Sequence, residues 1–408
     1  MLPNAIDTKR VEKSALLYSR GILFDIFPYF IHNIKDKFAY SIDISIILYY
    51  NLREINGGKE MRSFNYSAFK EQKWDSDILG LIAAIYKEAG KQEQYLKQRP
   101  QEMEKLVEIA KIQSTEASNA IEGIVTTSTR IKQLVEEKTT PRNRDEQEIA
   151  GYRDVLNVIH ESFDAIPITQ NYILQLHKML YSHMNNPLDG RTKSVQNYIS
   201  AAYPDGHTEI LFTPLEPNET SEALDRICEE YNRVIGNLEV EPLIIIPIFI
   251  HDFLCIHPFN DGNGRMSRLL TTLLLYQNGF YIGKYISLEA KISKNKDLYY
   301  SAMSQSQMGW HEGKEDALPF IKYILGTILA SYKDFEERTS LVQEKLPALE
   351  MVRMASKSKI GRFNKQDIRE LCPTLSDSSI EGALRKLVAA GELKKEGKGK
   401  STCYFRLN

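Results

Sequence analysis

The sequence predicts a mainly α-helical protein with one small β-hairpin and a C-terminal winged helix-turn-helix domain. Long stretches carry apolar residues at helical spacing, and the strand signals gather between residues 190 and 217. The last sixty residues change to a pattern of helix, turn, helix and basic hairpin. With 408 residues, of which 42% are hydrophobic and 26% charged, the chain can bury several cores, which argues against disorder or a fibre.

Charge and cysteine content limit the classes of function. A formal net charge of -2 argues against a chain that coats nucleic acid or membrane over its whole surface. The four cysteines, at positions 228, 255, 372 and 403, have no zinc or disulfide spacing, which favours a reducing cytoplasm. No targeting segment and no run long enough to cross a bilayer stands out, so we expect a cytoplasmic protein without a membrane partner.

Residues 1–60 fit the rest of the chain poorly. Their apolar and polar patches alternate, and they end in REINGGKEM, where Met61 opens a cleaner helical region. We expect a peripheral appendage or an upstream extension from a start codon chosen too early. The regions expected after it are an N-terminal helical region over 61–140, a central domain over 141–335 and the winged helix-turn-helix domain over 346–408.

The helices are predicted from apolar periodicity. Ile78, Ile82 and Ile85 repeat at helical spacing between a candidate N-cap, Asp75, and a candidate stop, Gly90. Further helices are expected at Gln101–Gln113, around Ser118, and at Asp145–Phe163, Gln170–Tyr181, Thr220–Ile235 and Pro242–Cys255. The extended runs VQNYIS and ILFTPL flank PDGHTE, and an Asp-Gly turn in that position predicts a hairpin.

The C-terminal region predicts its own domain. FNKQDIRELCP and SDSSIEGALRKLVAAGEL predict two helices, the second capped within Ser376–Ser379, and LKKEGKGKSTCYFRL predicts two strands around a Gly/Lys tip. Two acids, Glu392 and Glu396, stand against seven basic residues: Arg385, Lys386, Lys394, Lys395, Lys398, Lys400 and Arg406. Phosphate attraction is plausible, but winged helices also pack against protein, so DNA and protein both remain candidate partners.

The stretch HPFNDGNGRMSR, residues 257–268, concentrates polar residues directly after the apolar run PLIIIPIFIHDFLCI. The following MSRLLTTLLLYQNGF has a helical apolar stripe that ends at Asn278 and Gly279. The motif is therefore predicted to be a loop that leads into a helix N-terminus. Glycines, exposed N–H groups and the helix dipole at such a position favour a bound anion.

Four side chains of the motif favour nucleotide chemistry. Arg265 and Arg268 are three residues apart, so we expect them on one helix face, where both can bind phosphate oxygens. Asp261 in this positive setting is expected to hold Mg²⁺, which bridges carboxylate and phosphates. His257 is a candidate general base, because imidazole accepts protons near neutral pH. No protein nucleophile stands out, which favours direct transfer to a substrate hydroxyl.

Two structural alternatives explain less of this motif. GNGRMS is a near miss of the dinucleotide-binding fingerprint, but Pro247 lies in the middle of the candidate strand before it. A histidine that merely caps a helix would account for His257. It would not account for Asp261, Asn263 and the two arginines beside it.

The motif HPFNDGNGRMSR resembles the signature of the Fic family, whose members typically transfer AMP from ATP to a protein hydroxyl. The resemblance extends over about residues 65–335. LHKML and GRTKSVQNYIS are similar to the family's lead-in helix and flap, LFTPLEP to its return strand, and LYYSAM to its nucleotide-binding tyrosines. It implies a Fic-type helical core, ATP as cosubstrate, Mg²⁺ as cofactor and, by analogy only, a homodimer.

The resemblance also implies a role for each site residue. His257 would deprotonate a Ser, Thr or Tyr hydroxyl of a target protein that binds along the flap hairpin by strand addition. Asp261 would ligate Mg²⁺, and Arg265 and Arg268 would bind the outer phosphates. Further nucleotide contacts are expected from Ile199, Ser200, Asn260, Gly262, Asn263, Gly264, Tyr299, Tyr300 and Gln307. Ser200 and Ala201 stand where many relatives have two glycines.

A second motif, SNAIEG at residues 118–123, matches the family's inhibitory helix pattern, in which Ser118 and Glu122 occupy fixed positions. The resemblance implies that Glu122 pairs with Arg268 and keeps ATP in a non-productive pose. The alternative is a helix-ending Glu-Gly on a solvated face.

Two classes of function stay open. The first is a regulated protein adenylyltransferase, with removal of AMP as a reverse activity. The second is a nucleotide-sensing transcriptional or toxin-control module that acts through the winged helix. Covalent labelling by ATP separates them.

Overall fold

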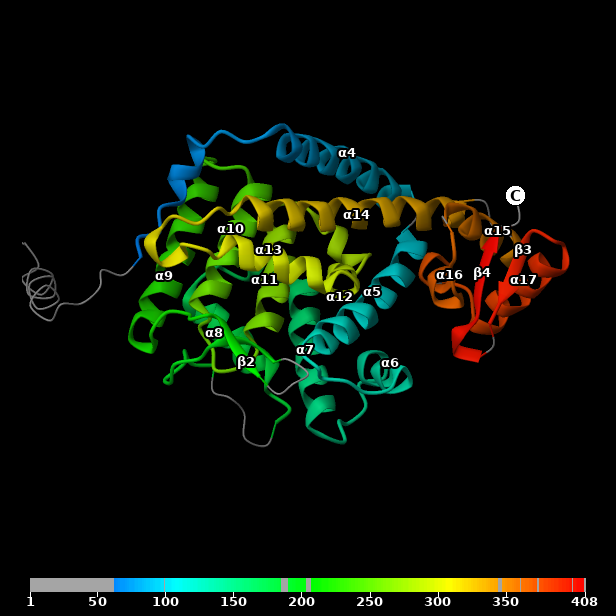
Figure 1. Cartoon of the computed structure of the whole chain (residues 1–408), viewed down its shortest axis with the longest axis horizontal. Coiled ribbons are helices and arrows are strands. Elements are labelled where there is room, and N and C mark those ends of the chain that lie inside the picture. The colour runs from blue at the N-terminus through cyan, green and yellow to red at the C-terminus, as the bar shows by residue number, and fades with distance from the viewer. Residues whose placement is uncertain are drawn as a thin grey trace, which may run out of the picture. The chain divides into compact units, whose positions relative to one another are not determined.

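Figure 1 shows a computed structural model of the chain. The structure describes residues 62–98, 100–184, 190–202, 207–343, 347–359, 361–372, 374–397 and 399–406. The expectation for residues 1–60 lies outside these ranges. The described part is mainly helical with two two-stranded sheets, which confirms the predicted fold class. None of its helices is both long and apolar enough to span a membrane.

The helical body is built from α4 to α14. These are α4 (Ser76–Gln98), α5 (Pro100–Ile121), α6 (Ser128–Glu136), α7 (Arg144–Ser162), α8 (Gln170–Leu180), α9 (Pro217–Gly236), α10 (Pro242–Ile256), α11 (Asn263–Gln277), α12 (Leu288–Lys294), α13 (Lys296–Ser306) and α14 (Leu318–Gln343). The 3₁₀ segments here are η1 (Tyr66–Lys70), η2 (Phe163–Ala165), η3 (Tyr281–Lys284) and η4 (Trp310–Glu312). Several helices begin at a side-chain cap. Thr127, Asn143, Thr169 and Ser287 each accept the backbone N–H three residues further on.

Helices α10 and α11 form the centre of this body. Every residue of α10 from Leu243 to Ile256 is buried, which is the expected behaviour of a helix that is apolar on all sides. Pro247 lies inside this helix, so the run is not the strand of a dinucleotide-binding fold. Helix α11 packs on α10 and is buried from Met266 to Tyr276. The loop between the two helices, residues 257–262, is therefore held between two buried helices.

Helix α4 is longer than predicted. Asp75 Oδ1 accepts the N–H of Ile78 at 3.0 Å, which confirms the predicted N-cap. The predicted stop at Gly90 is wrong, because α4 continues to Gln98 along α14 (Figure 1). A glycine inside a helix costs roughly 1 kcal/mol. Packing after Gly90 outweighs this cost: the ring of Tyr95, for example, lies against that of Phe335 with centroids 6.1 Å apart.

The predicted hairpin is present. Strands β1 (Ile199–Ala202) and β2 (Thr208–Phe212) pair antiparallel, with Ser200 opposite Ile210 and Ala201 opposite Glu209. The pairing shifts register between Ile199 and Ser200. Residues 203–206, which contain the predicted Asp-Gly turn, lie outside the described ranges.

The C-terminal residues have a core of their own. The elements are α15 (Ala348–Ser358), α16 (Lys365–Leu371), α17 (Asp377–Ala389), β3 (Leu393–Glu396), η5 (Gly399–Ser401) and β4 (Cys403–Arg406). Ser376 caps α17 by accepting the N–H of Ser379, and β3 pairs antiparallel with β4, as the sequence predicts. The winged-helix assignment and the domain boundaries stay predictions. Helix α14 runs to Gln343, so the boundary expected at residue 335 falls inside a helix.

Candidate active site

The HPFNDGNGRMSR motif lines a cavity of about 350 Å³, a size that suits a nucleotide-sized ligand. The structure brings most of the predicted site residues together here: Glu122, Ile199, Ser200, His257, Asn260, Asp261, Gly262, Asn263, Gly264, Arg268, Tyr299, Tyr300 and Gln307. The rest of the lining was not anticipated: Tyr198, Leu211, Leu254, Met303 and Ser304. Two predicted residues, Ser118 and Arg265, do not line the cavity.

His257 is oriented as a proton acceptor. It ends α10 in the left-handed region, with φ 51° and ψ 62°. Its Nδ1 lies 3.1 Å from the carbonyl oxygen of Leu254, which can only accept, so Nδ1 carries the proton and Nε2 keeps its lone pair. Burial lowers the pKa of His257 to about 4. The imidazole is therefore neutral at pH 7 and can take up a proton from a substrate.

The glycine turn is arranged to receive an anion. Gly262 precedes α11 with φ 85°, a conformation that side chains with Cβ rarely adopt, and a Cβ there would meet Tyr181 Oη at 2.8 Å. The side chain of Asn263 bonds both backbone groups of Phe259, at 2.9 Å to the nitrogen and 2.7 Å to the oxygen. Asn263 thus closes the turn, while the first N–H groups of α11 have no acceptor within the helix and favour an anion.

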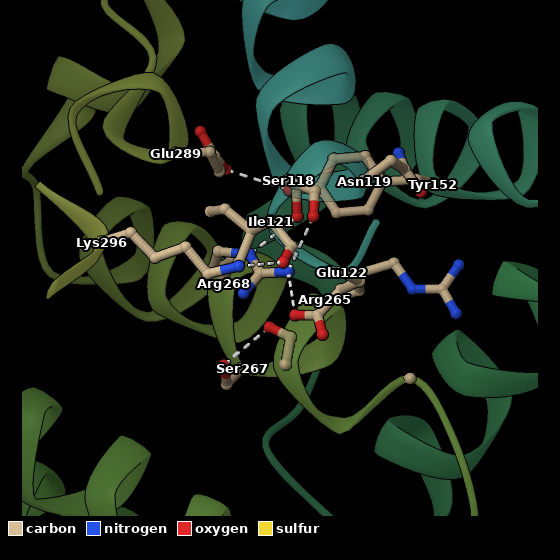
Figure 2. A network of polar contacts seen from close by, with 12 residues as sticks. Ser118, Asn119, Ile121, Glu122, Tyr152, Arg265, Ser267, Arg268, Glu289 and Lys296 are labelled. Carbon is tan, nitrogen blue, oxygen red and sulfur yellow. Dashed lines mark hydrogen bonds and ion pairs between the residues drawn. The ribbon is translucent and has the colours of Figure 1, made fainter. Parts of the chain in front are cut away.

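The two arginines of the motif do not act together as expected. Arg265 is only 1% exposed, and its guanidinium pairs with Glu148 of α7 at 2.8 Å and donates to Tyr181 Oη at 2.7 Å. In Figure 2 its side chain extends away from Arg268. Arg265 therefore lies outside the cavity lining, and its expected contact with phosphate stays a prediction. The i, i+3 spacing fixes the helix face but not which partner a long side chain reaches.

Arg268 carries the charge that faces the cavity, and three bonds tie it to the end of α5. Its Nε donates to Ser118 Oγ at 2.8 Å, and its Nη2 donates to the Ser118 carbonyl at 2.9 Å and to Glu122 Oε1 at 2.8 Å (Figure 2). Ser118 is fully buried, whereas the Glu122 side chain is 34% exposed. The expected Glu122–Arg268 pair is therefore present in the structure.

Glu122 lies directly on the glycine turn. A Cβ atom at Gly264 would collide with Glu122 Oε1, so the carboxylate sits against the N-terminus of α11. Lys296 at the start of α13 donates to the carbonyl of Ile121, the last residue of α5, at 2.7 Å (Figure 2). A cation at this helix end also interacts favourably with the helix dipole. The segment that presents Glu122 is thus fixed from both α11 and α13.

Asp261 fits a Mg²⁺ site that substrate phosphates complete. Its side chain is 50% exposed at the cavity, and Oδ1 accepts the N–H of Gly262 at 2.7 Å. The described residues contain no group of three or more His, Cys, Asp or Glu side chains that could hold a metal ion. A single carboxylate is nevertheless sufficient where phosphates and water supply the remaining oxygens of Mg²⁺.

His177 supports this loop and was not anticipated. Its Nε2 lies 3.0 Å from the carbonyl oxygen of Asp261, and its ring stacks on Phe259 with centroids 3.7 Å apart. Burial lowers the pKa of His177 to about 4, so the ring is neutral at pH 7. The sequence gives no signal for this contact, because it depends on how α8 packs against the loop.

The opposite wall of the cavity comes from one face of α13. Tyr299 is buried against Phe320 and Tyr323 of α14, and Tyr300 meets it edge-on at 5.4 Å. Gln307 follows directly after the helix and is 7% exposed. Met303 and Ser304 lie one turn beyond the tyrosines, so helical spacing from Tyr299 and Tyr300 could have identified them.

Comparison with known proteins places this site in context. The family model described as Fic/DOC family matches residues 167–275, which include the loop and α11 as far as Leu275 but not Glu122, Tyr299 or Tyr300. Two curated relatives are similar in sequence. "Protein adenylyltransferase Fic" of Nematostella vectensis is 25% identical over 232 residues, or 54% of this chain and 48% of the relative. "Protein adenylyltransferase fic-1" of Caenorhabditis elegans is 25% identical over 186 residues, or 44% of this chain and 32% of the relative.

The chain therefore spans less than half the length of these curated relatives. Among solved structures, a Fic family protein from Desulfovibrio desulfuricans G20 has a TM-score of 0.53 at 19% identity. It covers 83% of this chain and 98% of its own length. At this level of identity the likeness concerns the fold.

Proposed function

The chain belongs to the Fic/DOC family, and from this premise we propose that it is a protein adenylyltransferase that transfers AMP from ATP to a protein hydroxyl. One observation carries the proposal. His257, whose Nε2 is unprotonated, lines one cavity together with the N-terminus of α11 and Arg268. A base, an anion-binding helix end and a buried cation are what transfer of a phosphate-linked group to a hydroxyl requires.

The transfer step follows from this arrangement. A hydroxyl of the target protein gives its proton to His257 Nε2 while its oxygen attacks the α-phosphorus of ATP. The bond from the α-phosphorus to the bridging oxygen breaks, and pyrophosphate leaves with the electron pair. The N–H groups at the start of α11 stabilise the charge on the α-phosphate, and Arg268 binds the outer phosphates. Mg²⁺ held by Asp261 would neutralise further phosphate charge.

We propose that the target segment binds beside the hairpin as an added strand. Among the described residues, β1 and β2 pair only with each other, so each has an edge that another extended segment could pair with. Tyr198, Ile210 and Leu211 are about half exposed there, at 54%, 56% and 48%. Tyr198 and Leu211 also line the cavity, so a paired segment would lie next to His257.

We propose that Glu122 inhibits this reaction in the state described. The carboxylate occupies Arg268 and the turn at Gly264, where an outer phosphate would otherwise bind. A phosphate brought to the same place meets a negative charge instead of a positive one. ATP can then enter only in a pose that does not align its α-phosphate with His257.

Labelled ATP tests the proposal. The purified chain and its Glu122→Gly variant are incubated with Mg²⁺ and a cell lysate, using ATP labelled at the α-phosphate or at the γ-phosphate. We expect the added chain to increase protein label over that of the lysate alone from the α-position only, more so in the variant, and no increase when His257→Ala is added to the variant. Binding of a fluorescent ATP analogue checks that His257→Ala still holds nucleotide. An increase in label from the γ-phosphate that depends on the added chain, or no increase from either position, would overturn the proposal.

A further inference from the structure

The segment between residues 193 and 197, here called the strap, runs along the loop that carries His257. Lys193 and Asn197 are the two strap residues that bond to this loop. Lys193 is 2% exposed, although lysine is rarely buried without a role. The strap leads directly into β1 of the hairpin.

Four consecutive carbonyl oxygens around His257 accept hydrogen bonds from the strap. Lys193 Nζ donates to Ile256 at 3.2 Å, and the Lys193 backbone N–H donates to Pro258 at 2.7 Å. The Asn197 side chain donates to His257 at 3.3 Å and to Phe259 at 2.9 Å. Lys193 Nζ also donates to Asn197 Oδ1 at 2.8 Å, which joins the two side chains to each other. The strap therefore holds the backbone on both sides of the imidazole.

This backbone needs such support. His257 has a positive φ of 51°, and a left-handed conformation costs a residue with a Cβ roughly 1–2 kcal/mol. Such a conformation persists only where its surroundings fix it. Ile256 is also the last residue of α10, so its carbonyl belongs to the group that has no partner inside the helix, and the Lys193 ammonium caps it.

The charge of Lys193 also acts on the imidazole. Burial has the largest effect in lowering the pKa of His257, and the Lys193 ammonium lowers it further, whereas Glu122 and Asp261 oppose this. Burial lowers the pKa of Lys193 itself to about 8, so the ammonium remains charged at pH 7. One side chain thus supports both the geometry of the base and its neutral form.

We infer that Lys193 and Asn197 are positioning residues that hold His257 in its left-handed conformation with Nε2 facing the cavity. The inference rests on the proposed function, because it assigns to the strap the orientation of the proposed base. Neither residue lines the cavity, so both act through His257 and not through contact with nucleotide.

The test uses the full chain carrying Glu122→Gly, with Lys193→Met, Lys193→Arg or Asn197→Ala added. We expect Lys193→Met and Asn197→Ala to lower kcat about tenfold or more at an unchanged KM for ATP, because small displacements of a catalytic group cost this much. Lys193→Arg keeps the charge and should restore part of the loss. Lys333→Met, at an exposed lysine of α14, is the matched control and should change neither constant.

Nitrogen shifts of the histidine rings give a readout that does not depend on activity. The His257 signals are assigned by their loss in His257→Ala, and they should report one tautomer in the parent and a mixture of tautomers in Asn197→Ala. Thermal melting verifies that each variant is folded. If the parent transfers no AMP, the proposed function fails, while the ring signals still decide the role of the strap. Parent-like kcat and parent-like ring signals in both Lys193→Met and Asn197→Ala would overturn the inference.

Discussion

Glu122→Gly removes the carboxylate that lies on the glycine turn, and we expect it to raise the rate of AMP transfer. The contact with Arg268 must break before an outer phosphate can take its place. Under the proposed inhibition the productive state would be a minor population of the intact chain, and we expect the variant to make it the major one. Glu122 lies after the end of α5, so glycine at this position does not interrupt the helix.

The size of the effect follows from the contact. Two unit charges 2.8 Å apart would attract each other by about 6 kcal/mol at an effective dielectric constant of about 20. The net attraction is smaller, because the Glu122 side chain is 34% exposed and its carboxylate gains hydrogen bonds with water when the contact breaks. A net stabilisation of about 2–3 kcal/mol, as for a charge-assisted hydrogen bond, is therefore expected. At about 1.4 kcal/mol for each factor of ten, the transfer rate should rise roughly 30- to 150-fold.

The assay is the initial rate of label transfer from α-labelled ATP at saturating nucleotide, compared between the intact chain and the variant. Glu122→Gln keeps the size and loses the charge, so it should give most of the increase. Glu108→Gln, at an exposed glutamate of α5, is the control. A rate in Glu122→Gly within twofold of the intact chain would refute the reasoning, provided that both proteins bind nucleotide.

Two further predictions concern other groups. Lys296→Met removes the bond from the Lys296 ammonium to the Ile121 carbonyl, worth about 1.5 kcal/mol for a charged donor, so the AMP-transfer rate should rise roughly tenfold, less than in Glu122→Gly. An increase as large as that of Glu122→Gly would contradict this ranking. Burial lowers the pKa of His160 to about 3 and that of His251 to about 4, from 6.5. The unfolded chain then binds protons that the folded chain does not, so stability is lost as pH falls below 6.5, by on the order of 1–2 kcal/mol per histidine at pH 5. Melting curves should show a lower Tm at pH 5 than at pH 7, and an unchanged Tm would contradict the buried neutral state.

Much of the fold is encoded in local sequence patterns. The Asp75 cap, the Ser376 cap and the positions of α7 to α11 follow from periodicity and capping residues that act within one turn. The end of α4 does not, because the contacts that carry it past Gly90 come from α14, more than 200 residues later in the chain. Local signals predict where helices begin, whereas long-range packing decides how far this one continues.

The candidate site likewise has features that the local sequence predicts and features that depend on long-range packing. The motif was sufficient to expect His257, Asp261 and the glycine turn in one cavity, because a short loop between two predicted helices keeps its residues close together. The pairing of Arg268 with Glu122 was expected from the resemblance alone. The pairing of Arg265 with Glu148 could not be predicted, since Glu148 lies on a helix more than 100 residues earlier in the chain. Lys193 was missed for a related reason: a lysine in a predicted flap is expected at the surface, and only the fold buries it.

The diversion of Arg265 to Glu148 leaves Arg268 as the only arginine or lysine among the described residues that line the cavity. Under the proposed inhibition, the Glu122 carboxylate and the outer phosphates of ATP would both need this single positive charge. While Glu122 holds it, we expect ATP to bind with its outer phosphates displaced from Arg268, so added nucleotide alone would not relieve the inhibition. A second cation in the lining would give the phosphates a partner of their own, and the carboxylate would then inhibit less.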